Sequence, residues 1–314
     1  MRLNAILVAV AVLAPIVARA DDKPARRVLG SDKGKVALVE PDGKVAWEVP
    51  IKGQAHDLAL LPNGNILFST GPATVVEMTP AKEVAWSYTS RPMDGYDGPV
   101  EVHAFQRLPD GLTMIAETGN KRLIEVDRDG KIVRQVALQV DHPHPHRDTR
   151  MARKLDNGHY LVCHEADGTV REYDPEGRVV WSYELDLNNR PKSPGHGVEG
   201  HGNEVFGAIR LPDGNTLIAA GNGNRVIEVD PKGTIVWSLE QDELPGIKLA
   251  WVTTLERRPN GNLIVGNCHA GPANPQLIEV TRDKKVVWTF LDFRTFGDSL
   301  AAAQVLDLEP GTIR

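Results

Sequence analysis

Residues 211–239 read LPDGNTLIAAGNGNRVIEVDPKGTIVWSL, and this stretch decides the fold. The turn signal Leu211-Pro-Asp-Gly214 is followed by an apolar run, an alternating segment (VIEV), a second turn signal (PKG) and a strand that contains Trp237. Asp-Gly and Asn-Gly pairs between apolar runs are the strongest short-range signals of β-hairpins. The stretch therefore predicts a meander of short antiparallel strands.

The same unit recurs along the whole chain. Its first turn is found at Leu61-Pro-Asn-Gly64, Leu108-Pro-Asp-Gly111, Leu155-Asp-Asn-Gly158, Leu211-Pro-Asp-Gly214, Arg258-Pro-Asn-Gly261 and Leu308-Glu-Pro-Gly311. The glycines of these turns are 47, 47, 56, 47 and 50 residues apart. Four short strands in a repeat of about 40–50 residues are the signature of a β-propeller, so the six turns predict six blades.

The two ends of the chain indicate how the ring closes. The last repeat contains only an innermost strand, near residues 302–308, whereas residues 27–49 contain the other three strands of a blade. We therefore predict an all-β fold, a six-bladed β-propeller of four-stranded blades, whose closing blade is built from both termini. Closure of this kind leaves no free sheet edge between the first and the last blade.

Residues 1–20 read as a secretory signal peptide. Arg2 provides the positive start, residues 5–17 form an apolar run too short to span a bilayer, and Ala18-Arg19-Ala20 is a cleavage site. We expect a protein that is exported, periplasmic or secreted, after cleavage near Ala20, with residues 21–314 forming a single propeller domain and no membrane span. The net charge of −6 argues against nucleic acid as a partner.

The repeats resemble known propeller families. The EVDPKGTIVWSL unit, which follows LPDGNTLIAAG, resembles the repeats of PQQ-like propellers, and Ala55-His-Asp-Leu-Ala-Leu-Leu-Pro-Asn-Gly-Asn65 resembles the strands of bacterial arylsulfotransferases. The first resemblance implies a repeat scaffold and does not imply the quinone cofactor. The second implies a histidine that accepts a sulfuryl group, and it matches only the strand of His56. A fold-level resemblance by itself does not determine the chemistry.

One position of the repeat is not filled uniformly across the blades, and it marks the candidate catalytic residues. Eight residues before each anchor glycine stand His56, His103, Arg150, Phe206, Thr253 and Ala303. Innermost strands line the central channel, so these side chains are expected to ring one of its mouths. His56, His103 and Arg150 would form a cationic arc, in which imidazoles handle protons and the guanidinium binds an anion. The alternative is that polar residues merely line a solvent-filled channel.

The candidate ligand-binding residues belong to the same mouth. The ends of the second strands and the long loops between blades are expected there, and long loops at one end of a rigid scaffold are typical of binding sites. These segments contribute Glu117, His164, His201, Asn222, Trp251 and His269. Trp251 is either a platform for a ring-shaped ligand or a plug of the channel.

Other side chains have a structural interpretation. The glutamates at one equivalent position in five blades indicate hydrogen bonding between blades, and they are Glu77, Glu125, Glu172, Glu228 and Glu279. Cys163 and Cys268 are expected to be free thiols, because they belong to non-adjacent blades. Clustered imidazoles and carboxylates suit a divalent metal, but their spacing matches no metal motif, so the metal and the cofactor stay open.

These observations favour an exported propeller that binds a small polar or anionic ligand, such as a sugar or an aryl sulfate, at the loop-rich mouth. A transferase, hydrolase or lyase reaction at the His/His/Arg arc is compatible with this arrangement. The alternative is a non-catalytic PQQ-like repeat propeller that binds a ligand or a protein partner. The substrate, the reaction and the oligomeric state stay open.

Overall fold

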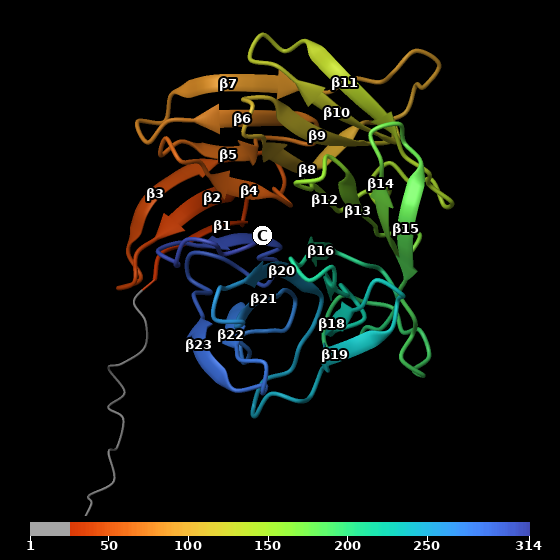
Figure 1. Cartoon of the computed structure of the whole chain (residues 1–314). Helices are drawn as coiled ribbons and strands as arrows, with labels where there is room; N and C mark the ends of the chain where they lie inside the picture. The colour runs from red at the N-terminus through yellow and green to blue at the C-terminus, as the bar shows by residue number, and fades with distance from the viewer. Residues whose placement is uncertain (1–25) are drawn as a thin grey trace, which may run out of the picture.

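The computed structural model describes residues 26–314, and the predicted signal peptide lies outside this part of the chain. The described residues form 24 β-strands, and no helix among them is long and apolar enough to cross a bilayer. The strands assemble into six antiparallel four-stranded sheets arranged in a ring around a common centre (Figure 1). The prediction of an all-β, six-bladed propeller is therefore confirmed.

Each sheet is one blade, and the strands of a blade run in order from the innermost to the outermost. The first three blades are β24 (Ala302–Val305), β1 (Val28–Asp32), β2 (Lys35–Val39) and β3 (Val45–Pro50); β4 (Leu58–Leu60), β5 (Ile66–Ser69), β6 (Thr74–Met78) and β7 (Val84–Thr89); and β8 (Glu101–Arg107), β9 (Thr113–Thr118), β10 (Arg122–Val126) and β11 (Ile132–Ala137). The other three are β12 (Met151–Lys154), β13 (Tyr160–His164), β14 (Thr169–Tyr173) and β15 (Val179–Glu184); β16 (Gly207–Arg210), β17 (Thr216–Ala219), β18 (Val226–Val229) and β19 (Ile235–Leu239); and β20 (Val252–Arg257), β21 (Leu263–Asn267), β22 (Leu277–Val280) and β23 (Val286–Phe290).

The closing blade joins the two ends of the described chain. β24 pairs with β1 in an antiparallel register in which Val28 faces Val305 and Ser31 faces Ala302. The last strand thus occupies the innermost place of the blade that β1, β2 and β3 begin, as the sequence predicts. This pairing holds the first and last blades together by backbone hydrogen bonds.

The repeated glutamates connect neighbouring blades. The Glu77 carboxylate accepts hydrogen bonds from Asn65 of its own blade at 2.7 Å and from Arg107 of the next blade at 2.8 Å. The Arg107 guanidinium lies 5.0 Å from the ring centroid of Trp86, one of the repeated tryptophans. The interpretation of these repeated residues as blade-to-blade connections is confirmed.

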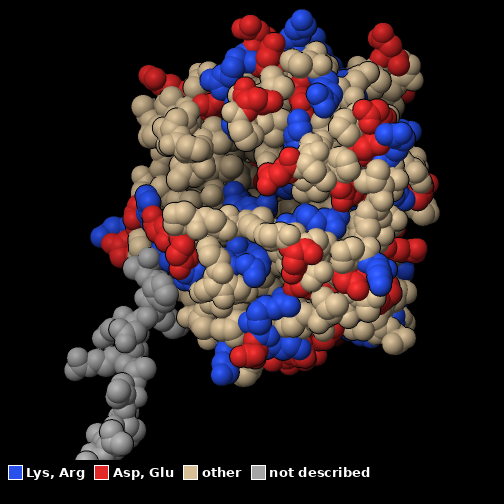
Figure 2. Space-filling model, viewed as in Figure 1, with Lys and Arg blue, Asp and Glu red and all other residues tan. Residues whose placement is uncertain are grey.

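The interior of the channel is almost filled by side chains. The remaining cavity has a volume of about 20 Å³ and is lined among others by His56, Phe206, Ala303 and Arg314. That volume holds about one or two water molecules. Figure 2 shows the central hollow with side chains of both charge signs around it. An organic ligand of the channel therefore has to bind at a mouth.

The two cysteines are free and buried. Burial raises the pKa of both thiols, so each behaves as a small apolar side chain and not as a nucleophile. This confirms the expectation of free structural thiols.

Candidate functional site

The segment just before β4, the innermost strand β8 and the loop between β11 and β12 bring three histidines together at one end of the channel. The ring centroid of His103 lies 4.5 Å from that of His56 and 4.8 Å from that of His146, and the rings of His56 and His146 are 5.9 Å apart. His103 is only 3 % exposed. We call these three histidines, together with Glu101 and Arg150, the mouth cluster.

A β-bulge determines where His103 points. Val102 of β8 pairs with Glu117 and Ala104 pairs with Ala116, so His103 is the extra residue in the ladder. A bulge of this kind turns a side chain out of the regular alternation of a strand, and bulges are frequent next to functional sites. The bulge places the His103 ring between Glu101 and Arg150.

Glu101 joins two of the histidines. Its Oε2 lies 2.9 Å from Nε2 of His103 and 2.7 Å from Nδ1 of His146. His146 comes from the loop between β11 and β12, which reaches back over the preceding blade to make this contact.

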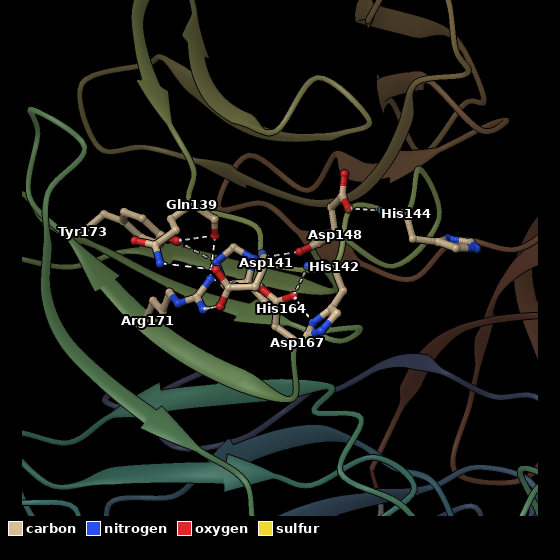
Figure 3. A network of polar contacts seen from close by, with 9 residues as sticks. All are labelled: Gln139, Asp141, His142, His144, Asp148, His164, Asp167, Arg171 and Tyr173. Atoms are coloured by element: carbon tan, nitrogen blue, oxygen red, sulfur yellow. Dashed lines mark hydrogen bonds and ion pairs between the residues drawn. The ribbon is translucent and has the colours of Figure 1, made fainter.

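Buried carboxylates hold that loop in place (Figure 3). Asp148 accepts hydrogen bonds from the backbone amides of His144 at 2.5 Å and Gly119 at 2.9 Å. Asp167 accepts from the backbone amides of Asp141 at 3.0 Å and His142 at 2.8 Å. The ring of His144 points away from this network in Figure 3. These anchors explain how a surface loop can present the His146 ring at a defined position.

Arg150 determines which nitrogen of His103 carries the proton. One guanidinium nitrogen of Arg150 lies 3.3 Å from Nδ1 of His103, and the same guanidinium forms a buried ion pair with Glu165. A guanidinium only donates hydrogen bonds, so Nδ1 of His103 accepts. We therefore assign the proton of the neutral ring to Nε2, which donates to Glu101.

His56 and His103, the two most enclosed histidines of the mouth cluster, are neutral at pH 7. Burial lowers the pKa of His103 to about 4, although the hydrogen bond with Glu101 opposes this shift. Burial, and then the neighbouring His103 and Arg150, lower the pKa of His56 well below its usual range. The hydrogen bonds from His103 and His146 hold the pKa of Glu101 far below that of a free carboxyl group.

The structure therefore differs from the expected cationic arc. Glu101 and Glu165, which the repeat pattern does not place in the arc, together outweigh the single positive charge of Arg150. Because His56 and His103 are neutral, Arg150 is the only charged member of the predicted arc, and it is paired with Glu165. Desolvation of the imidazoles is the physical reason, since burial disfavours the charged form.

The other candidate residues are distributed over three places. Glu117 and His164 are completely buried within their blades: Glu117 accepts a hydrogen bond from Arg122 at 2.6 Å, and His164 bonds the carbonyl of Asp148 at 2.7 Å and the Tyr173 hydroxyl at 2.8 Å. In this structure neither side chain reaches solvent. Figure 3 shows His164 within the network beneath the loop.

His201 and Asn222 line a separate pocket of about 290 Å³ between loops of one face. Asn222 forms hydrogen bonds with Glu204 through both ends of its side-chain amide. The amide nitrogen donates to the Glu204 carboxylate at 2.8 Å. Glu204 also pairs with Arg147 at 2.7 Å. This ion pair connects the pocket to the loop that carries His146.

Trp251 and His269 meet at a third place, around His196. The ring centroid of His196 lies 4.3 Å from that of Trp251 and 5.3 Å from that of His269. Trp251 is 6 % exposed and packs in an apolar cluster with Phe206 and Cys268. This packing corresponds to the interpretation of Trp251 as a plug.

Three residues of the site are missing from the catalytic and ligand-binding residues that the sequence predicts: Glu101, His146 and Glu165. A signal for Glu101 exists in the sequence, because the spacing Glu101-Val-His103 places two side chains on one side of a regular strand. The contact of His146 with Glu101 depends on the path of a loop, and no spacing in the sequence predicts that path.

Known structures share this architecture. A protein of unknown function from Bacteroides caccae is 24 % identical, with a TM-score of 0.74, and the match covers 90 % of this chain and 100 % of that chain. A catalytically inactive virginiamycin B lyase from Staphylococcus aureus, solved with quinupristin, is 15 % identical with a TM-score of 0.55 and 88 % coverage of both chains. A streptogramin B lyase is 12 % identical with a TM-score of 0.56, covering 87 % of this chain and 85 % of that chain. These likenesses show the fold alone.

No curated protein matches the chain significantly. The resemblance to arylsulfotransferases stays a prediction, whereas the resemblance to PQQ-like repeats is confirmed by a family model. That model, PQQ_2, is described as "Outer membrane protein assembly factor BamB" and matches residues 32–290. The chain therefore belongs to this family of PQQ-like β-propellers.

Proposed function

We propose that this protein is exported and binds a small polar ligand at the mouth of its channel, through the mouth cluster. The observation that carries the proposal is the convergence of His56, His103 and His146 with Glu101 and Arg150, at the edge of a channel whose interior is closed. Histidines that only stabilised single blades would not need to lie next to one another. His56, Glu101 and His146 are at least partly exposed and can contact a ligand directly, whereas His103 and Arg150 lie buried behind them.

The pKa values define what the cluster can do alone. With pKa values well below 7, His56 and His103 act at neutral pH as hydrogen-bonding partners, whereas an efficient proton carrier needs a pKa near the working pH. The ring of His56 takes part in no hydrogen bond within residues 26–314, so its nitrogens are available to a ligand. The low pKa values of His56 and His103 thus favour a binding role for these two residues.

Export is part of the same proposal. The signal peptide predicted for residues 1–20 supports it, and the family description names an outer membrane assembly factor. Together they favour the periplasm as the place where the ligand is met.

A ligand screen tests the proposal. Sulfate, glucose and 4-nitrophenyl sulfate are each added to the mature protein, and the unfolding temperature is measured. A ligand at 100 times its Kd stabilises the folded state by about 2.7 kcal/mol. We expect at least one compound to stabilise the wild type and His159→Ala equally, because His159 lies in a turn and pairs with Glu172. The His56→Ala, His103→Ala double variant should lose this stabilisation, and stabilisation that survives in it would contradict the proposal.

A second candidate function is a protein-binding module. Besides the family description, it is favoured by exposed valines near the start of the outermost strand of all six blades: Val45, Val84, Val133, Val180, Val236 and Val287. Outermost strands have one unpaired edge, with which a strand of a partner protein can pair. Screening results in which no compound stabilises the protein would favour this module.

A further inference from the structure

Within the mouth cluster, Glu101, His103 and His146 form a set of metal-ligand atoms. One carboxylate oxygen and two imidazole nitrogens of these residues all lie within 4.8 Å of one another. Two of the separations, from Oε2 of Glu101 to each imidazole, are 2.9 Å and 2.7 Å. The ligand atoms of a tetrahedral zinc ion, with bonds of roughly 2.0–2.2 Å, stand roughly 3.3–3.6 Å from one another, so the Glu101 contacts must lengthen slightly to admit the ion.

We propose that Glu101, His103 and His146 bind one divalent transition-metal ion, such as Zn²⁺, at the channel mouth and leave one coordination position open. Two histidines and one glutamate with an open fourth position are the ligand set of catalytic zinc sites. This inference rests on the proposed function, because the open position is where the polar ligand would bind.

The charges of the mouth cluster favour a cation. Two carboxylates, Glu101 and Glu165, face the single guanidinium of Arg150, so these three side chains carry an excess of one negative charge, which a divalent ion reverses. The resulting positive charge is the one that an anionic ligand requires.

His56 provides a second observation. Its ring lies 4.5 Å from that of His103 and has no hydrogen-bond partner among the described residues. The side chain is partly exposed, at the wall of the closed channel. The nitrogens of His56 are thus placed beside the metal ligands, where they can bond to a water or a ligand at the open position.

Arg150 competes with the metal in this structure. Metal binding at Nε2 of His103 moves the ring proton to Nδ1, and the guanidinium donor of Arg150 already points at Nδ1 from 3.3 Å. Arg150 must then withdraw toward Glu165. Replacing both members of that ion pair, in Arg150→Gln, Glu165→Gln, removes the competing donor without leaving an unpaired buried charge. We expect the double variant to bind zinc more tightly, whereas an anion site built on Arg150 would be lost.

Equilibrium dialysis of the mature protein against Zn²⁺, without any other ligand, tests the inference. We expect one zinc per chain in the wild type and a loss of affinity of roughly 100-fold or more in Glu101→Gln and in His146→Ala. His142→Ala is the matched control, because His142 lies in the same loop with its side chain 75 % exposed, and its zinc affinity should stay unchanged. Far-ultraviolet circular dichroism verifies that each variant is folded.

Two outcomes overturn the metal site: no stoichiometric zinc in the wild type, or stoichiometric zinc that persists in Glu101→Gln and His146→Ala. Weaker zinc binding in the Arg150→Gln, Glu165→Gln variant would also contradict it. The ligand screen separates this inference from the proposed function. If compounds bind at the mouth but zinc does not, only the metal site is wrong, and if zinc binds but no compound does, only the ligand site is wrong.

Discussion

Replacing Glu279 with alanine is expected to lower the free energy of unfolding by about 3–5 kcal/mol, the cost of breaking a buried ion pair. The Glu279 carboxylate is completely buried and pairs with both Arg26 and Arg258, and it also accepts a hydrogen bond from Asn262 at 2.7 Å. Its removal leaves two largely buried guanidinium groups without their common partner. Arg26 precedes β1, so the lost contacts connect the last blade to the closing blade.

Urea unfolding followed by tryptophan fluorescence measures this effect. Glu176→Ala is the control, because the Glu176 side chain is 67 % exposed and its contact with Arg178 belongs to one turn. Exposed pairs of this kind contribute about 0–1 kcal/mol. Equal losses in the two variants would contradict the role of the repeated glutamates as connections between blades.

Acidification from pH 7 to pH 5 is expected to destabilise the protein through its buried histidines. Burial lowers the pKa of His164 to about 4, while the hydrogen bond to the Asp148 carbonyl opposes the shift. An unfolded histidine has a pKa of about 6.5, so between these two values the unfolded state binds more protons than the folded state. The free energy of unfolding therefore falls with falling pH, by on the order of 2 kcal/mol for His164 at pH 5. His103, with its pKa also about 4, acts in the same direction.

Unfolding free energies at pH 7 and pH 5 test this expectation in the wild type and in His164→Asn. The variant is less stable at pH 7, because it loses the bonds to Asp148 and Tyr173, but its stability should depend less on pH. His142→Asn, which changes an exposed ring, should keep the full wild-type dependence. An identical pH dependence in His164→Asn would show that this histidine is not held neutral by the fold.

The fold could be predicted because its decisive signals are local and repeated. The turns at Gly64 and Gly214 and the alternating segments between them recur in every blade, so the strand order follows from the repeat itself. The closure by β24 follows from counting strands at the two ends. The same alignment of repeats also places His56, His103 and Arg150 next to one another, as the structure shows.

The contacts within the site could be predicted only in part. Because His164 ends its strand, the sequence predicts it at the mouth. However, the side chains of a strand alternate between the two faces of a blade. His164 turns into the blade, and the next residue, Glu165, reaches Arg150. The approach of His146 to Glu101 depends on a loop held by Asp148 and on a bulge in β8, and both are properties of the tertiary structure.

Histidine-selective ¹⁵N NMR of the mature protein at pH 7 tests most directly whether the mouth cluster is the ligand site. In the free protein we expect His103 to be neutral, with its proton on Nε2. On titration with 4-nitrophenyl sulfate, or with another compound that stabilises the protein in the screen, the signals of His56, His103 and His146 should shift, whereas those of His159 and His164 should not. A protonated His103, or ligand-induced shifts confined to histidines outside the mouth cluster, would contradict the proposed site.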